Sequence, residues 1–252
     1  MNIFQIQATN GSTDDSPVIV ALDVPTEEEA LQWVARLTPE LCQLKIGNEL
    51  FTATGRKFVE SLVLRGFRVF LDLKYHDIPN TVSRACRVAG DMGVWMVNVH
   101  IDGGREMLEA AANALASFSH RPLLVGVTVL TSLDLSDLLS PQAGFSLERW
   151  VMQKASLAKS SGLDGVVCSA QEVKLIKAQL GYNFLTITPG IRVGTLTQDD
   201  QKRTLTPEEA LSTGTDYLVM GRPIRQTRDP VTLLRELNQK ARTIRSQIVE
   251  PK

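Results

Sequence analysis

Short apolar runs alternate along the chain with longer amphipathic stretches, and this alternation repeats eight times. The runs are apolar at successive positions rather than at every second one, which is typical of strands buried on both faces of a parallel sheet. Each run is followed by a stretch with helical periodicity, of which the last spans 229–245. The pattern predicts strands at 18–23, 41–47, 68–74, 95–100, 122–131, 164–169, 184–189 and 217–221.

Eight β–α units in a chain of 252 residues match the (β/α)8 TIM barrel, in which a helix follows every parallel strand. A doubly wound open sheet is the alternative α/β architecture, but the regular succession of eight units favours the barrel. We therefore predict an α/β fold made of one TIM-barrel domain. We expect a flexible N-terminal lead at 1–16, the barrel at 17–246 and a C-terminal tail at 247–252.

Composition and charge argue against several classes of partner. The formal net charge of -1 gives no electrostatic reason to bind nucleic acid or an anionic membrane, and no apolar run approaches the ~20 residues of a membrane span. The first sixteen residues lack the basic and apolar regions of a signal peptide. Cys42, Cys86 and Cys168 are scattered and odd in number, which argues against a disulfide framework. We therefore expect a cytoplasmic location.

The ends of the first three strands carry a concentration of charge. Asp72 and Lys74 are two positions apart, so their side chains lie on one side of a strand, and Asp77 follows just past it. Lys45 ends the neighbouring strand, and Asp23 ends the first. Active sites of TIM barrels lie at these strand ends. A lysine held among carboxylates there can donate a proton or stabilise a developing anion; structural salt bridges are the alternative interpretation.

The ends of the seventh and eighth strands predict a phosphate site. Thr188-Pro-Gly-Ile-Arg192 follows the seventh strand, and Gly221-Arg222-Pro223 follows the eighth. TIM barrels frequently bind phosphate in these two loops through backbone N–H groups, and arginine presents a guanidinium fork suited to phosphate. The polar loop from Gly190 to Arg203, which contains Gln201, has the length of an active-site lid, although a simple insertion would look the same.

These segments, in this order, resemble the signature of the orotidine 5'-phosphate decarboxylase family. The resemblance extends from Val18 to about Leu237, and the pattern looks like that of the bacterial, monofunctional members of the family. The segments that carry it are Ala21-Leu-Asp23, Leu44-Lys-Ile-Gly47, Asp72-x-Lys74-x-x-Asp77 within Phe70-Leu-Asp-Leu-Lys-Tyr-His-Asp-Ile-Pro-Asn-Thr81, Thr188-Pro-Gly-Ile-Arg192 and Gly221-Arg-Pro223.

The resemblance implies a cofactor-independent decarboxylation of orotidine 5'-phosphate to UMP in pyrimidine biosynthesis, with no metal or organic cofactor. It implies a homodimer in which Asp77 and Thr81 reach the partner's site, and a C6 carbanion that Lys74 stabilises and protonates beside Asp72. It also implies ligand contacts from Asp23 and Lys45 to the ribose, from Gln201, Gly221 and Arg222 to the 5'-phosphate with Arg192 beside the lid, and from Thr131, Ser132 and Pro189 to the rest of the ligand.

Two other functions remain open at this point. Metal-dependent ketose-phosphate decarboxylases and synthases of the same superfamily share the Asp-x-Lys-x-x-Asp signature, but have a metal-binding glutamate where Lys45 stands. A cation at that position repels Mg²⁺ and argues against them. A non-catalytic nucleotide-binding barrel is the other alternative, although pure binding gives no reason for several charges to be held at the strand ends.

Overall fold

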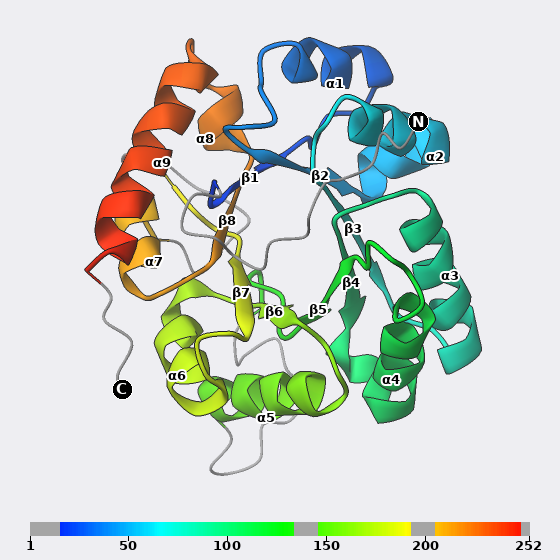
Figure 1. Cartoon of the computed structure of the whole chain (residues 1–252). Helices are drawn as coiled ribbons and strands as arrows, with labels where there is room; N and C mark the ends of the chain where they lie inside the picture. The colour runs from blue at the N-terminus through cyan, green and yellow to red at the C-terminus, as the bar shows by residue number, and fades with distance from the viewer. Residues whose placement is uncertain (1–15, 134–145, 193–204, 248–252) are drawn as a thin grey trace.

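Eight parallel strands form a closed barrel in which spatial order follows sequence order, and helices surround it (Figure 1). The structure is a computed structural model that describes residues 16–133, 146–192 and 205–247. The strands are β1 Val18–Ala21, β2 Gln43–Gly47, β3 Val69–Tyr75, β4 Met96–His100, β5 Leu123–Val127, β6 Gly165–Val167, β7 Leu185–Thr188 and β8 Tyr217–Met220. The predicted single-domain TIM barrel is confirmed. The predicted lid and most of the N-terminal lead and C-terminal tail lie outside the described residues.

A helix follows every strand, as the sequence pattern predicts. They are α1 Glu27–Val34, α2 Asn48–Leu64, α3 Pro79–Asp91, α4 Gly104–Leu115, α5 Leu147–Ser160, α6 Ala170–Leu180, α7 Pro207–Ser212, α8 Arg222–Arg225 and α9 Pro230–Arg245, with a 3-10 turn η1 at Ile101–Gly103. Thr26 caps α1 by accepting a hydrogen bond from the Glu29 amide, which satisfies a free N–H at the helix start.

Two local expectations were wrong. The fifth strand was predicted to continue to residue 131, but β5 ends at Val127, where its pairing with the three-residue β6 ends. The Thr128 hydroxyl then donates to the Val167 carbonyl, and the chain leaves the sheet. The short helix α8 directly after β8 was not expected. Pro223 lies in its first turn, and proline is as typical of a plain turn as of the first turn of a helix.

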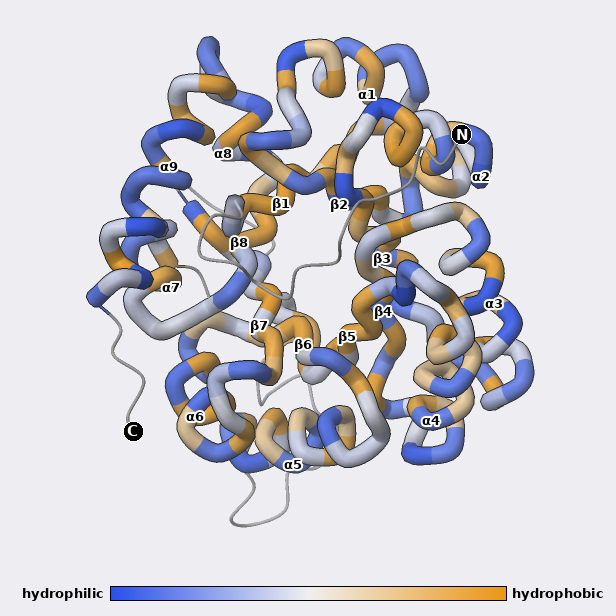
Figure 2. The backbone as a smooth tube through the Cα atoms, in the orientation of Figure 1, coloured by the Kyte–Doolittle hydropathy of each residue, from blue (hydrophilic) through white to orange (hydrophobic). Residues whose placement is uncertain are grey.

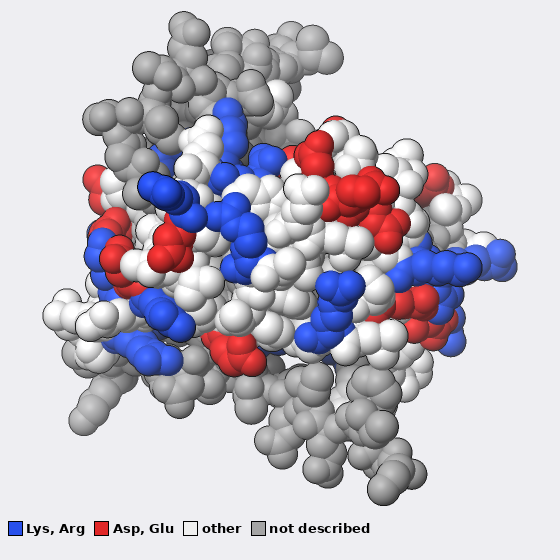
Figure 3. All heavy atoms as spheres, turned by 90° about the horizontal axis from the view of Figure 1, so that it is seen from above, with Lys and Arg blue, Asp and Glu red and all other residues white. Residues whose placement is uncertain are grey.

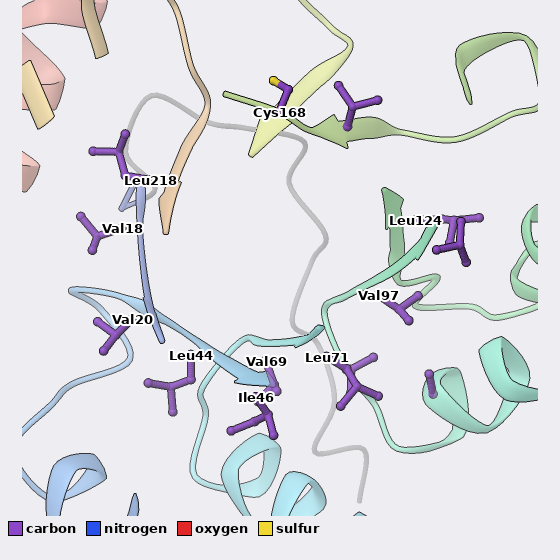
Figure 4. Packing of buried hydrophobic residues seen from close by; sticks show 14 of the residues in the cluster. Val18, Val20, Leu44, Ile46, Val69, Leu71, Val97, Leu124, Cys168 and Leu218 are labelled. Carbon is purple, nitrogen blue, oxygen red and sulfur yellow. The ribbon is translucent and has the colours of Figure 1, made fainter. Parts of the chain in front are cut away.

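Alternation along the strands divides the core into two clusters. Ile19, Phe70, Met96, Ile187 and Tyr217 form one buried cluster, and the residues beside them along the strands belong to a second, larger one. Successive strand residues point to opposite faces, so the first cluster fills the barrel interior and the second lies between strands and helices. Figure 4 shows part of the second cluster, and Figure 2 shows hydrophobic segments running along the strands.

Two aspartates hold the end of the barrel opposite the strand tips. The carboxylate of Asp164, just before β6, accepts from the Leu124 amide at 2.7 Å and pairs with both terminal nitrogens of Arg121. Asp216, just before β8, accepts from the Thr186 amide at 2.7 Å and pairs with buried Lys177 at 2.6 Å. Each carboxylate thereby links neighbouring strands and stiffens the end of the barrel that lies opposite the strand tips.

The outer surface carries both signs of charge. Lysine and arginine side chains are interspersed with aspartate and glutamate over the face seen in Figure 3, in keeping with the net charge of -1. Among the described residues, no helix has the length and apolar character required to cross a bilayer.

Candidate active site

Four charged side chains from three neighbouring strand ends form a continuous chain of alternating sign. Nζ of Lys45 lies 3.0 Å from Oδ1 of Asp23 and 3.2 Å from Oδ2 of Asp72. The other oxygen of Asp72, Oδ1, lies 2.7 Å from Nζ of Lys74. We call these four residues the charged array. The parallel register explains it, because β2 pairs with both β1 and β3 and brings their carboxyl ends to one edge.

Burial and opposite charge act against each other on the middle pair. Burial alone would lower the pKa of Lys45, but the carboxylates of Asp72 and Asp23 outweigh it and raise that pKa above its ordinary value. Burial would likewise raise the pKa of Asp72, but Lys45 and Lys74 outweigh it and the pKa is lowered. Both groups are therefore charged near neutral pH, and the array holds a carboxylate between two ammonium groups.

The backbone at Lys74 has an unusual conformation that aims its side chain. Its φ of 52° lies in the left-handed region, and it is the only described non-glycine residue with a positive φ. The β3–β4 pairing shifts register between Leu71 and Tyr75, so Lys74 stands at an irregularity in the ladder. Such a conformation costs on the order of 1–3 kcal/mol, and it persists only where surrounding contacts determine it.

Asn98 of β4 supplies those contacts and was missed in the sequence. Its side-chain carbonyl accepts a hydrogen bond from the Lys74 amide at 2.8 Å, and its side-chain nitrogen donates to Oδ1 of Asp72 at 2.6 Å. The residue is fully buried and faces the barrel interior. A polar residue inside the otherwise apolar run Met96-Val-Asn-Val was the available signal, because a buried amide requires partners.

The array forms one wall of a cavity of about 360 Å³ at the carboxyl ends of the strands. Arg225, Leu130 and Cys168 line it as well, although none of them was predicted, and so does Gly190 of the predicted phosphate loop. The sequence pattern places Cys168 within the sixth strand, but it lies just after the end of β6. The predicted site residues that line this cavity are Asp23, Lys45, Asp72, Lys74, Thr131, Ser132, Pro189, Arg192, Gly221 and Arg222.

Two predicted site residues do not line the cavity of the single chain. Asp77 and Thr81 are exposed at the start of α3, and Oδ1 of Asp77 accepts from the following Ile78 amide at 2.6 Å. Gln201 lies outside the described residues. Ile78 between the two exposed polar residues is itself 67 % exposed, which is high for a large apolar side chain.

Two glycines allow the backbone to approach the charged array closely. A Cβ atom on Gly47 would lie 3.3 Å from Nζ of Lys45 and 3.6 Å from Oδ1 of Asp23. A Cβ atom on Gly221 would lie 3.4 Å from Oδ2 of Asp23. A side chain at position 47 would therefore press on Nζ of Lys45, and one at position 221 would touch the carboxylate of Asp23.

A second polar group lies next to the array, around the tip of β4. The rings of His76 and His100 are 5.6 Å apart between centroids, and burial, followed by the nearby His76, lowers the pKa of His100. Lys154 of α5 forms an ion pair with Asp102 and lies 4.4 Å from the centre of the Trp150 ring. Among the described residues, no group of histidine, cysteine, aspartate and glutamate side chains has an arrangement suited to a metal ion.

Comparisons with known proteins agree with this geometry. Residues 16–237 match the model of the family described as orotidine 5'-phosphate decarboxylase / HUMPS. A protein from Neisseria meningitidis serogroup B named orotidine 5'-phosphate decarboxylase is 57% identical over 90% of this chain and 92% of its own. One of the same name from Laribacter hongkongensis is 58% identical over 88% of this chain and 92% of its own.

Solved structures give the same picture of the fold. The crystal structure of orotidine 5'-phosphate decarboxylase from Lactobacillus acidophilus superposes with a TM-score of 0.77 at 34% identity, covering 90% of this chain and 99% of that one. An uncharacterized conserved protein from Geobacillus kaustophilus superposes with the same TM-score at 38% identity and covers 89% of this chain.

Proposed function

The chain belongs to the orotidine 5'-phosphate decarboxylase / HUMPS family, and we infer that it decarboxylates orotidine 5'-phosphate to UMP in pyrimidine biosynthesis. The observation that carries this function is the charged array, which holds Lys45 and Lys74 around one buried carboxylate at the mouth of the barrel. The relatives that are more than half identical, over about nine-tenths of the chain, bear the decarboxylase name and favour it over the other activities of the family.

The substrate is expected to lie across the cavity with its phosphate at the tips of β7 and β8. Arg222, the Gly221–Arg222 backbone and Arg192 line that side and offer donors to the 5'-phosphate. The ribose hydroxyls then reach Asp23 and Lys45, since Asp23 lies beside Gly221. This placement brings the pyrimidine ring toward Lys74. Thr131, Ser132 and Pro189 line the remaining wall, and Gln201 joins the phosphate contacts in the prediction from the family.

The chemistry requires stabilisation of a carbanion without an electron sink in the substrate ring. The bond between C6 and the carboxylate carbon breaks, CO2 leaves, and the electron pair remains on C6. The ammonium group of Lys74 offsets that charge and then transfers a proton to C6, which completes UMP and leaves a neutral amine that water reprotonates. Binding of the remote phosphate supplies energy for ordering and desolvating the reacting end.

Asp72 pairs with both lysines and orients them. It accepts from Lys74 and Asn98 and pairs with Lys45, so its carboxylate has little rotational freedom. In the proposed complex it lies near the substrate carboxylate. Repulsion between the two carboxylates is a second way in which it can favour loss of CO2.

We propose that two copies of the chain form a homodimer through the start of α3. The support is the exposure of Asp77 and Thr81 together with Ile78, which presents an apolar side chain between two polar ones. In the dimer Asp77 joins the partner's array and Thr81 contacts the partner's ligand. Burial of Ile78 would stabilise this contact by about 1.5–3 kcal/mol.

We further propose that the reaction uses no metal or organic cofactor. Lys45 places an ammonium group where a metal-dependent relative needs an anionic oxygen ligand, and this cation repels Mg²⁺. The thiols of Cys42, Cys86 and Cys168 are buried and unpaired with one another, which fits the proposed cytoplasmic location. The proposed barrel domain spans 17–246.

One assay tests the function directly. We expect the purified protein to consume orotidine 5'-phosphate at the same rate with and without EDTA. The loss of the substrate's ultraviolet absorbance measures this rate. No turnover would contradict the decarboxylase assignment. Turnover that EDTA abolishes would instead favour the metal-dependent branch of the superfamily.

A further inference from the structure

The phosphate side of the cavity is lined by a third arginine, Arg225, in addition to Arg192 and Arg222. Arg222 and Arg225 both belong to α8 and are three positions apart. Side chains at this spacing on a helical turn lie on the same side. The cavity therefore meets two guanidinium groups from one short element that directly follows β8.

The Nε atom of Arg225 is buried, and among the described residues it has no hydrogen-bond acceptor. The buried ammonium groups outside the array do have partners, because Lys154 pairs with Asp102 and Lys177 with Asp216. A buried donor without a partner costs free energy comparable to a lost hydrogen bond. An anion that enters the cavity would remove this cost.

The negative charge of the expected ligand complements the positive charge of these arginines. A phosphate monoester carries about -1.5 to -2 charges near pH 7 and presents three acceptor oxygens. Arg192 and Arg222 supply two positive charges, and the carboxylate of Asp23 lies close to Gly221 at the same turn. A third guanidinium fork offsets this nearby carboxylate and gives a further terminal oxygen of the phosphate its donors.

We propose that Arg225 is a further phosphate-binding residue of this cavity and shares the 5'-phosphate of the nucleotide with Arg222 and Arg192. The proposal rests on the function inferred above and extends it to a residue that the sequence signature does not include. Arg225 then determines selectivity for a nucleotide over a nucleoside, and it strengthens binding of the phosphate dianion over the monoanion.

Calorimetric titration with UMP and with uridine tests the proposal. We expect Arg225→Gln to weaken UMP binding about 10- to 100-fold, the range for lost charge-assisted hydrogen bonds, and to leave uridine binding unchanged. Arg225→Lys keeps the charge without the planar fork and should give an intermediate loss. The matched control Arg228→Gln removes the same charge three residues further along, at an exposed position away from the cavity lining, and should change neither affinity.

The pH dependence provides a readout that a purely structural role would not change. The second pKa of the phosphate is about 6, so UMP should bind the wild-type chain more tightly as the pH rises from about 5 to about 7. The rise should be smaller in Arg225→Gln. Equal weakening of UMP and uridine, or a change in UMP affinity below about twofold in both Arg225 variants, would overturn the proposal.

Failure of the proposal and failure of the proposed function give different results. If the wild-type chain binds UMP but does not turn over orotidine 5'-phosphate, the function is wrong while the comparison between UMP and uridine still decides the role of Arg225. If turnover is normal and Arg225→Gln binds UMP like the wild type, only the role of Arg225 is wrong. Absence of UMP binding by the wild type would overturn both.

Discussion

The side-chain nitrogen of Asn98 lies 2.6 Å from Oδ1 of Asp72, and the same amide accepts a hydrogen bond from the backbone of Lys74 through its oxygen. One buried side chain therefore fixes the carboxylate in the middle of the charged array and the left-handed backbone of the proposed proton donor. Side chains that act this way set geometry to within fractions of an ångström, on which electrostatic stabilisation depends.

Replacement of Asn98 should consequently harm turnover more than binding. In Asn98→Ala the Lys74 amide loses its partner and Oδ1 of Asp72 keeps only that of Lys74, which costs about 1–3 kcal/mol of stability. We expect kcat for orotidine 5'-phosphate to fall at least about tenfold, because the ammonium group is no longer aimed at C6. Steady-state kinetics and urea unfolding measure both effects.

Asn113→Ala, at an exposed position of α4, is the matched control and should leave kcat and the free energy of unfolding unchanged. An Asn98→Ala protein with normal kcat but reduced stability would mean that Asn98 supports the fold alone.

The barrel and the charged residues could be predicted because they follow from short-range rules. Continuous apolar runs require strands that are buried on both faces, and charge at the end of such a run, as at Asp72, is costly unless it is paired. Parallel strands place their carboxyl ends at one edge, so Lys45 and Asp72 had to be neighbours once the strand order was assumed. These inferences needed no knowledge of the loops.

Features that depend on tertiary detail could not be predicted. The positive φ of Lys74 results from a shift in register between β3 and β4, and nothing in the local sequence indicates it. Arg225 reads as one more surface arginine until α8 is seen to place it against the cavity. The early end of β5 follows from the shortness of its neighbour β6, which the apolar run through residue 131 conceals.

Lys74 is the group on which the proposed chemistry depends most. We expect Lys74→Ala to lose measurable turnover, because C6 then has neither a compensating charge nor a proton source. UMP should still bind, because the phosphate and ribose contacts are made by other residues. Absorbance assays measure the loss of turnover, and calorimetry measures whether UMP still binds.

The exposed lysine of α2, Lys57, offers the control Lys57→Ala, which should behave like the wild type. Retention of more than a few per cent of activity in Lys74→Ala would exclude Lys74 as the only proton donor.

The proposed dimer predicts complementation between two inactive chains. Lys74→Ala and Asp77→Ala should each be inactive, because each lesion affects every site of its homodimer. A mixed dimer has one site that contains both lesions and one that contains neither, if Asp77 acts across the interface. Mixing the two proteins should therefore restore part of the turnover, up to about a quarter of the wild-type rate at random exchange.

Formation of mixed dimers can be followed independently by mass spectrometry of the intact complexes. Mixed dimers that form and remain inactive would show that Asp77 acts within its own chain or not at all.

The charged array should stabilise the folded chain over a broad range of pH. The pKa of Asp72 is lowered on folding, so its stabilising contribution is complete above the ordinary value of 3.8 and is lost as the pH falls through the lower folded value. The pKa of Lys45 is raised, so its contribution is complete below 10.5 and is lost only as the pH rises beyond it.

We therefore expect the difference in unfolding free energy between the wild type and Asp72→Asn to stay constant from about pH 5 to about pH 9. It should shrink only in stronger acid. Urea titrations at several pH values measure it, and a difference that changes steeply near pH 6 would mean that another group, such as His100, is coupled to the array.

Gly47 provides a last test, because it probes the Asp23–Lys45 ion pair without removing either charge. Its φ of -92° suits alanine, so Gly47→Ala should fold without backbone strain. The new Cβ atom would stand 3.6 Å from Oδ1 of Asp23, an ordinary contact, but 3.3 Å from Nζ of Lys45, so the ammonium group has to shift slightly. We expect an increase in KM of about 5- to 30-fold, since loss of about 1–2 kcal/mol of binding to the ribose hydroxyls gives that range. Asn48→Ala, at the exposed neighbouring position, should have a normal KM, and an unchanged KM in Gly47→Ala would place the ribose away from this ion pair.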